Sequence, residues 1–125
     1  MIIPLGPGES SLGRLAGDLL LLPTGTEILF VCCPESSPFP QQKHLQSMLS
    51  HLSLRWLQAD TGRALQLNAG AQAARGTVLW FVHSDCGFSP ALLDKLFNNL
   101  DKQPGALHYC RLAFMADGPG SMKLN

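Results

Sequence analysis

The residues best able to do chemistry in this sequence lie in the run His83-Ser84-Asp85-Cys86. It follows residues 77–82, whose β-branched and aromatic side chains predict a strand. A carboxylate at the end of a strand can hold a divalent cation on a diphosphate, since magnesium needs only one or two protein carboxylates there. His83 would point to the same side of an extended chain as Asp85, as a second ligand better suited to manganese. The same pattern also fits an Asx turn at Asp85 with a partly buried His83.

A second candidate site is the start of the alanine-rich segment 63–75. Free backbone N–H groups in the first turn of a helix attract anions, and Arg63 would add a fixed positive charge. Asn68 is a polar residue among small ones, and Gly70 permits close packing. An ordinary helix with an exposed Arg63 fits the segment equally well. The glycine-rich dinucleotide and phosphate-loop motifs and the Gly-x-Ser-x-Gly nucleophile motif do not occur in the chain.

Short apolar segments that alternate with helical ones must position these residues. Strands are predicted at residues 1–4, 27–33, 54–59, 77–82 and 107–115. Helices are predicted from Ser10 or Ser11 as far as Pro23, around 45–52, over 63–75 with Gly76 as the C-terminal glycine, and from Pro90 onward. Residues 28–31 are continuously apolar, which predicts a strand buried on both faces. The alternation predicts an α/β fold, a mostly parallel sheet with helices on both faces and ligands at the carboxyl ends of its strands.

Composition narrows the function classes. The 125 residues are 46% hydrophobic and 14% charged, which predicts one folded domain over residues 1–125. Nine basic residues balance nine acidic ones without a basic stripe, so nucleic acid is excluded as a partner. No apolar run approaches the length of a transmembrane segment. Four cysteines, two of them adjacent, do not form a disulfide pattern, so we expect a cytoplasmic location.

Several blocks of the sequence together resemble a known family. They are Gly62-Arg63-Ala64-x-Gln66-x-Asn68-Ala69-Gly70, Ala74-Arg75-Gly76, Leu79-x-Phe81-x-His83-x-Asp85 and the opening Ile2-Ile3-Pro4 with Glu9 after it. They are similar to the family-2-type glycosyltransferases over most of the chain. The His83-x-Asp85 pair resembles a bacterial subgroup with a His-Ala-Asp version of the usual Asp-x-Asp motif.

The resemblance implies a Rossmann-like GT-A fold that binds a nucleotide-diphosphate sugar, with UDP or GDP as the nucleotide. In such enzymes the aspartate matching Asp85 holds Mg²⁺ or Mn²⁺ on the diphosphate, and His83 would be its neighbour in the metal site. The residues implied to bind the nucleotide sugar are Pro4, Glu9, Arg63, Asn68, Ser84 and Asp85. Among these, Pro4 and Glu9 would line the base or ribose pocket. The resemblance implies a glycosyltransferase by lineage with an unknown acceptor. It assigns no general base, so catalysis by this chain alone stays open.

Two departures from the family pattern keep an alternative open. Cys32 stands where the family ends its second strand with an aspartate. Glu35 could supply that carboxylate from a shifted position, although nothing in the sequence requires it. Family members are also longer, so we expect this chain to be the donor-binding half, truncated at its C-terminal end. An uncovered sheet edge would then favour a homodimer, and a location peripheral to the inner membrane is also open. The alternative function is a non-catalytic nucleotide-binding or interaction module derived from a glycosyltransferase.

Overall fold

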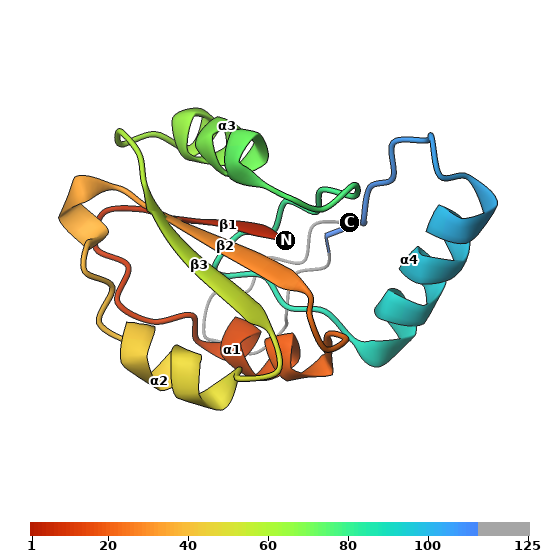
Figure 1. Cartoon of the computed structure of the whole chain (residues 1–125), viewed down its shortest axis with the longest axis horizontal. Helices are drawn as coiled ribbons and strands as arrows, with labels where there is room; N and C mark the ends of the chain where they lie inside the picture. The colour runs from red at the N-terminus through yellow and green to blue at the C-terminus, as the bar shows by residue number, and fades with distance from the viewer. Residues whose placement is uncertain (113–125) are drawn as a thin grey trace, which may run out of the picture. The chain divides into compact units, whose positions relative to one another are not determined.

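The computed structural model describes residues 1–112, which form two compact units: Met1–Pro90 and the described residues from Ala91 onward. The first unit is built on a three-stranded parallel sheet in the order β1-β2-β3 (Figure 1). Its strands are β1 (Ile2–Leu5), β2 (Glu27–Cys32) and β3 (Ser53–Gln58). The predicted α/β class with a parallel sheet is therefore confirmed.

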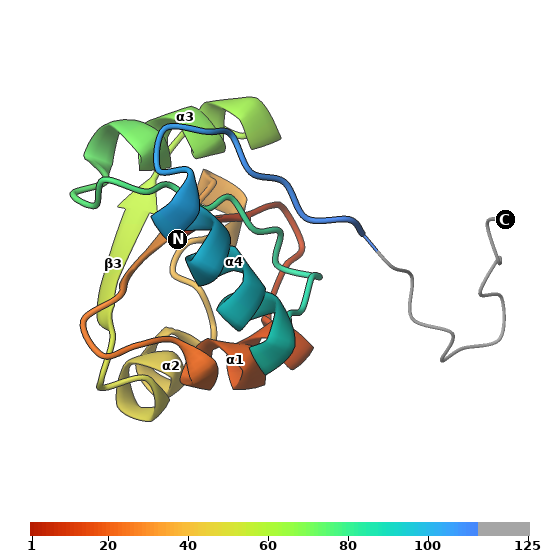
Figure 2. The same ribbon diagram turned by 90° about the vertical axis from the view of Figure 1, so that its right-hand side faces the viewer.

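Helices cover both faces of this sheet, as predicted. In Figures 1 and 2, α3 lies on one side of the strands, and α1 and α2 lie on the other. The helical elements are α1 (Arg14–Asp18), a 3₁₀ turn at Leu19–Leu21, another at Pro34–Ser36, α2 (Gln42–Met48), α3 (Arg63–Ala73) and α4 (Pro90–Lys102). The proline predicted to start the last helix is its first residue. Among residues 1–112, no helix has the length and apolar character needed to cross a bilayer.

The central strand β2 is the middle of the core. It pairs with β1 along one edge and β3 along the other, and all but its first residue are buried. On the side covered by α3, the side chains of Ile2, Leu29 and Val31 form a buried cluster. On the other side the ring of Phe30 stacks on Trp56, with ring centroids 4.3 Å apart. The prediction that this strand is buried on both faces is confirmed.

The helix α3 can approach the sheet closely because residue 70 has no side chain. A Cβ at Gly70 would clash with the side chain of Ile2 and would lie only 3.1 Å from Cγ2 of Val31. Real Cβ contacts are rarely this short, so one of the two elements would have to move. The expectation that Gly70 permits close packing is confirmed.

The strand predicted at residues 77–82 is wrong, because this segment makes a single parallel bridge, between Phe81 and Ile2. Ile2 uses both of its backbone groups there, with N···O distances of 2.8 and 3.0 Å. Alternate residues of a strand face the same neighbour, so the next donor of β1 on this edge would come from Pro4. Proline has no N–H, and the ladder therefore stops after one bridge.

The predicted start of the first helix is also wrong. The helix α1 begins at Arg14, after Gly13, and no side chain caps it, so neither Ser10 nor Ser11 does so. Gly13 has a φ of 51°, which turns the chain away from the helical path between the serines and the helix.

Other boundaries differ from the prediction as well: α1 ends at Asp18 rather than near Pro23, and α2 ends at Met48 rather than near residue 52. The helix α3 ends at residue 73 because Ala74 is extended, with ψ 140°, so Gly76 is not its C-terminal glycine. Residues 107–112 form no strand. Residues 113–115, the remainder of the strand predicted there, lie outside the described part of the chain.

A polar network ties the amino end of the sheet to the end of α3. The Arg55 guanidinium donates to the Glu27 carboxylate at 2.8 Å and to the carbonyl oxygen of Ala73 at 2.7 Å. The backbone N–H of Arg75 donates to the second Glu27 oxygen at 2.9 Å. Burial raises the pKa of Glu27, but the Arg75 N–H and the Arg55 guanidinium outweigh it, so the pKa lies below its ordinary value.

We expect the substitution Gly70→Ala to lower the free energy of unfolding by about 1–3 kcal/mol, the usual cost of overpacking. This cost outweighs the gain of up to about 1 kcal/mol that alanine brings to a helix. Urea denaturation measures the difference. The matched control is Gly17→Ala in α1, where a Cβ meets nothing within 4 Å. Equal stability changes in the two variants would contradict the close approach at Gly70.

The Glu27 network predicts a pH dependence of stability. A carboxylate whose pKa is lowered by folding stabilises the protein above its unfolded pKa, and this contribution is lost as the pH falls through the folded pKa. We therefore expect Glu27→Gln to be less stable than the wild type at pH 7, with the difference disappearing below about pH 4. Thermal unfolding at several pH values tests this, with the exposed Asp94→Asn as control. A difference that is constant with pH would show that the charge of Glu27 is not responsible.

Candidate functional site

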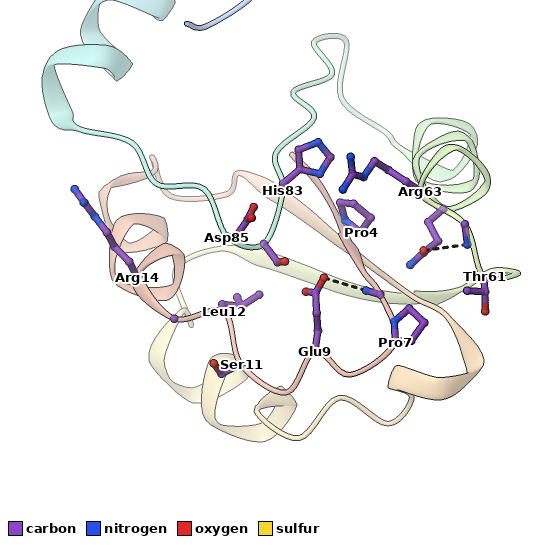
Figure 3. A pocket seen from close by; sticks show the side chains of 15 residues that line it. Pro4, Pro7, Glu9, Ser11, Leu12, Arg14, Thr61, Arg63, His83 and Asp85 are labelled. Atoms are coloured by element: carbon purple, nitrogen blue, oxygen red, sulfur yellow. Dashed lines mark hydrogen bonds between the residues drawn. The ribbon is translucent and has the colours of Figure 1, made fainter. Parts of the chain in front are cut away.

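A cleft with a volume of about 750 Å³ lies at the carboxyl end of β1. Its lining residues come from three segments that are far apart in the sequence, 4–14, 61–66 and 83–85 (Figure 3). The volume lies within the range of about 300–1,000 Å³ that is usual for small-molecule sites. Ligands of open parallel sheets bind at this edge, so the cleft lies where the fold class predicts a site.

Most of the residues implicated by the sequence line this cleft. They are Pro4, Glu9, Arg63, His83, Ser84 and Asp85. Asn68 does not line it: this residue lies on the exposed side of α3. The reason is helical geometry, because Gln66 faces the sheet and a position two residues later is rotated by about 200°. Cys32 and Glu35 also lie outside the lining, the former buried and the latter exposed.

Gln66 also lines the cleft, although its sequence position did not mark it as a site residue. Its side chain is 2% exposed and its amide nitrogen donates to the carbonyl oxygens of Leu5, at 2.9 Å, and Val31, at 2.7 Å. The amide oxygen accepts from the N–H of Gly62 at 3.4 Å. Gln66 thus joins the ends of β1 and β2 to the start of α3, beneath the cleft. The signal in the sequence was a polar residue four positions before Gly70, on the same face of the helix.

The loop after β2 is tied to the same place. The hydroxyl of Ser36, itself buried, donates to the Leu5 carbonyl oxygen at 2.8 Å and accepts from the N–H of Cys33 at 3.2 Å. At the rim, the hydroxyl of Thr61 donates to the Glu35 carboxylate at 2.7 Å, and this bond lowers the pKa of Glu35. The carboxylate after β2 is therefore bound to a cleft-lining residue rather than directed into the cleft.

Glu9 presents a carboxylate to the cleft. One oxygen accepts from the N–H of Gly6 at 3.2 Å. The other is buried and has no hydrogen-bond partner among the described residues. In Figure 3 the Glu9 side chain lies opposite the wall that carries His83 and Arg63. A buried carboxylate oxygen without a partner is costly, so this side chain needs a donor that the described residues do not supply.

The His83–Asp85 segment forms a tight turn at the edge of the cleft. The N–H of Cys86 donates to the His83 carbonyl oxygen at 3.0 Å, so a backbone bond closes the turn. The Cys86 thiol lies 3.8 Å from the Asp85 carboxylate. Burial raises the pKa of the Cys86 thiol, and the negative charge of Asp85 raises it further. The thiol is therefore protonated and donates toward Asp85.

The donor set of the turn fits a metal that is only partly held by protein. Within residues 1–112 no group of three or more histidine, cysteine, aspartate or glutamate side chains could hold a metal ion. His83 and Asp85 could supply two ligands from the cleft wall. Magnesium binds through one or two carboxylates when phosphate oxygens and water complete its shell, so these residues fit a metal that arrives with a diphosphate. They do not fit a closed structural zinc site.

We expect Gln66→Leu to lower the free energy of unfolding by about 1–3 kcal/mol, because buried backbone oxygens lose a donor and the Gly62 N–H loses its acceptor. Denaturant unfolding measures this loss. Gln46→Leu, at an exposed position of α2, is the matched control and should change stability by less than about 0.5 kcal/mol. If the two variants behave alike, the amide of Gln66 does not hold the strand ends together.

Comparison with known proteins gives one match. The family described as Glycosyl transferase family 2 matches residues 35–123, well over half of the chain. The matched region includes the start of α3 and the His83–Asp85 turn, whereas Pro4 and Glu9 precede it. Searches among curated proteins and among solved structures found no match.

Proposed function

We propose that this chain, which belongs to glycosyl transferase family 2, binds a UDP or GDP sugar with Mg²⁺ or Mn²⁺ in the cleft, as donor for transfer to an acceptor. The observation that carries the proposal is the convergence of three distant segments on that cleft. Between them they bring carboxylates, two arginines, a histidine and the first turn of a helix to one opening. This is the mixture of groups that a charged, hydroxyl-rich ligand requires.

The diphosphate would lie at the start of α3. No side chain caps this helix, whose preceding residue is Gly62. The first N–H groups of a helix without a cap favour an anion, and the partial positive charge of the helix dipole adds to this attraction. Arg63 lines the cleft at the same place and is exposed, so its guanidinium can reach a phosphate.

The turn His83–Asp85, on the same wall of the cleft as Arg63, would hold the metal on the diphosphate. When bound, a divalent metal acts as a Lewis acid that stabilises the charge left on the departing nucleoside diphosphate. Asp85 would supply the carboxylate and His83 a neighbouring nitrogen, and Ser84 between them would face the phosphates. These residues position the leaving group; the residue that takes the proton of the acceptor hydroxyl is not among them.

Glu9 and Pro4 would form the nucleoside end of the cleft. The free oxygen of the Glu9 carboxylate is an acceptor for a ribose hydroxyl or for an N–H of the base. Pro4 is buried at the end of β1 and offers an apolar surface without a donor. The two residues therefore suit the half-polar, half-apolar character of a nucleoside.

One observation favours a second candidate function, a non-catalytic module that binds a nucleotide or a protein partner. At the end of β2 the chain has Cys32, which is 3% exposed and whose pKa is raised by burial. The nearby carboxylate of Glu35 is already hydrogen-bonded by Thr61. The end of this strand therefore offers no free negative charge to a nucleotide base. A protein of this kind would keep the cleft without transferring sugar.

Titration calorimetry of UDP and GDP, with and without Mn²⁺, tests the proposed function. We expect one of the two nucleotides to bind more tightly in the presence of Mn²⁺ than in its absence. Asp85→Ala should lower the affinity measured with Mn²⁺ at least tenfold, because it removes the carboxylate that would bind the metal. Asp101→Ala, an equal change of charge on α4, should behave as the wild type. Failure of the folded wild type to bind either nucleotide would contradict the donor site. Metal-dependent binding without sugar transfer to any acceptor would favour the non-catalytic module.

A further inference from the structure

A side chain of α1 holds the backbone just after the His83–Asp85 turn. The backbone N–H of Phe88 donates to the carboxylate of Asp18 at 3.0 Å, between residues 70 positions apart in the sequence. Asp18 is the last residue of α1, and its side chain is 17% exposed. Phe88 is 5% exposed, so this hydrogen bond lies where competition by water is small.

The carboxylate of Asp18 also occupies the space beside the preceding residue. A Cβ built on Gly87 would lie 2.6 Å from the same Asp18 oxygen and 3.2 Å from Nε of Arg14. Arg14 lies one turn earlier on α1, with its Nε 3.7 Å from the Asp18 carboxylate. Only a residue without a side chain fits at position 87 while Asp18 keeps this place.

Other contacts of the turn are local or come from β1. The N–H of Val82 bonds to Ile2 before the turn, at 3.0 Å, and the rings of Trp80 and Phe88 lie 5.1 Å apart across its base. These contacts fix where the turn begins and how wide it is. The bond between Asp18 and the N–H of Phe88 adds a fixed point where the chain departs from the turn.

We infer that Asp18 is a positioning residue for the metal site: by holding the backbone at Phe88, it sets the place of the Asp85 carboxylate in the cleft. The inference rests on the proposed function, because it gives Asp18 a role only if Asp85 binds the metal and diphosphate. Asp18 does not line the cleft. Its effect is transmitted through three residues of backbone.

The experiment compares Asp18→Ala, Asp18→Asn and Gly87→Ala with the wild type. Asparagine keeps a side-chain oxygen that can accept from the Phe88 N–H, and it loses the charge that faces Arg14. Alanine at 18 removes the acceptor, and alanine at 87 displaces it. Calorimetry with the nucleotide that binds the wild type measures affinity with and without Mn²⁺. Hydrogen exchange of the Phe88 amide reports on the bond itself in the ligand-free protein.

We expect Asp18→Ala and Gly87→Ala each to lower the affinity measured with Mn²⁺ by roughly tenfold, as loss of a supporting residue does in other metal sites. The affinity without metal should stay within about twofold, and Phe88 exchange should become faster. Asp18→Asn should restore both the affinity and the slow exchange. A purely structural role would instead lower the two affinities together.

The outcomes separate the inference from the proposed function. If the wild type shows no metal-dependent binding, the proposed function fails and the inference fails with it. If the wild type binds but Asp18→Ala keeps the same metal-dependent affinity, the inference alone is overturned. The same holds if Asp18→Asn is as impaired as Asp18→Ala, because the charge and not the hydrogen bond would then matter. Gly17→Ala, the neighbouring change on α1, is the matched control and should leave both affinities unchanged.

Discussion

The cleft depends on the hydrogen bonding of one carbonyl group, that of Leu5 at the end of β1. A buried carbonyl oxygen must find donors, and a strand that stops inside a protein cannot obtain them from the ladder alone. This oxygen receives three: the Ser36 hydroxyl at 2.8 Å, the Gln66 amide at 2.9 Å and the Cys33 N–H at 3.3 Å. The donors come from the end of β2, the loop after it and α3. Satisfying one oxygen therefore fixes the elements around the cleft relative to one another.

On the other edge of β1 the constraint is a missing donor. Pro4 cannot extend the ladder beyond the bridge at Ile2, so the chain that runs beside β1 is released after Phe81. If that ladder had continued, His83 and Asp85 would lie in a strand, and their side chains would follow the pleat of the sheet. Released from it, the chain closes a turn between His83 and Cys86 at the cleft wall. The same proline thus ends the sheet and makes room for the site.

These two constraints explain how far the sequence could predict the structure. Residues 28–31 are all apolar, so their composition alone predicts a strand buried on both faces, and this prediction is confirmed. Residues 77–82 have a high strand propensity as well, but a ladder needs a donor from the partner strand, which Pro4 does not have. Gln66 was not recognised as a site residue because its importance depends on where the carbonyl groups of β1 and β2 end in space. Asn68 was grouped with the site by motif, whereas the phase of α3 places it on the exposed side.

Under the proposed function, the composition of the cleft makes the metal and the nucleotide dependent on each other. His83 and Asp85 leave most of a metal's coordination shell to other oxygens, and a diphosphate is the part of the donor that has them. Conversely, Arg63 and the start of α3 neutralise only part of the diphosphate charge. Each ligand then raises the affinity for the other by the same factor, as thermodynamic linkage requires. Each affinity is higher when His83 and Asp85 hold their place before metal or nucleotide arrives, because no binding free energy is then lost in ordering the turn. A turn anchored by hydrogen bonds at Ile2 and Asp18 meets that requirement from both of its ends.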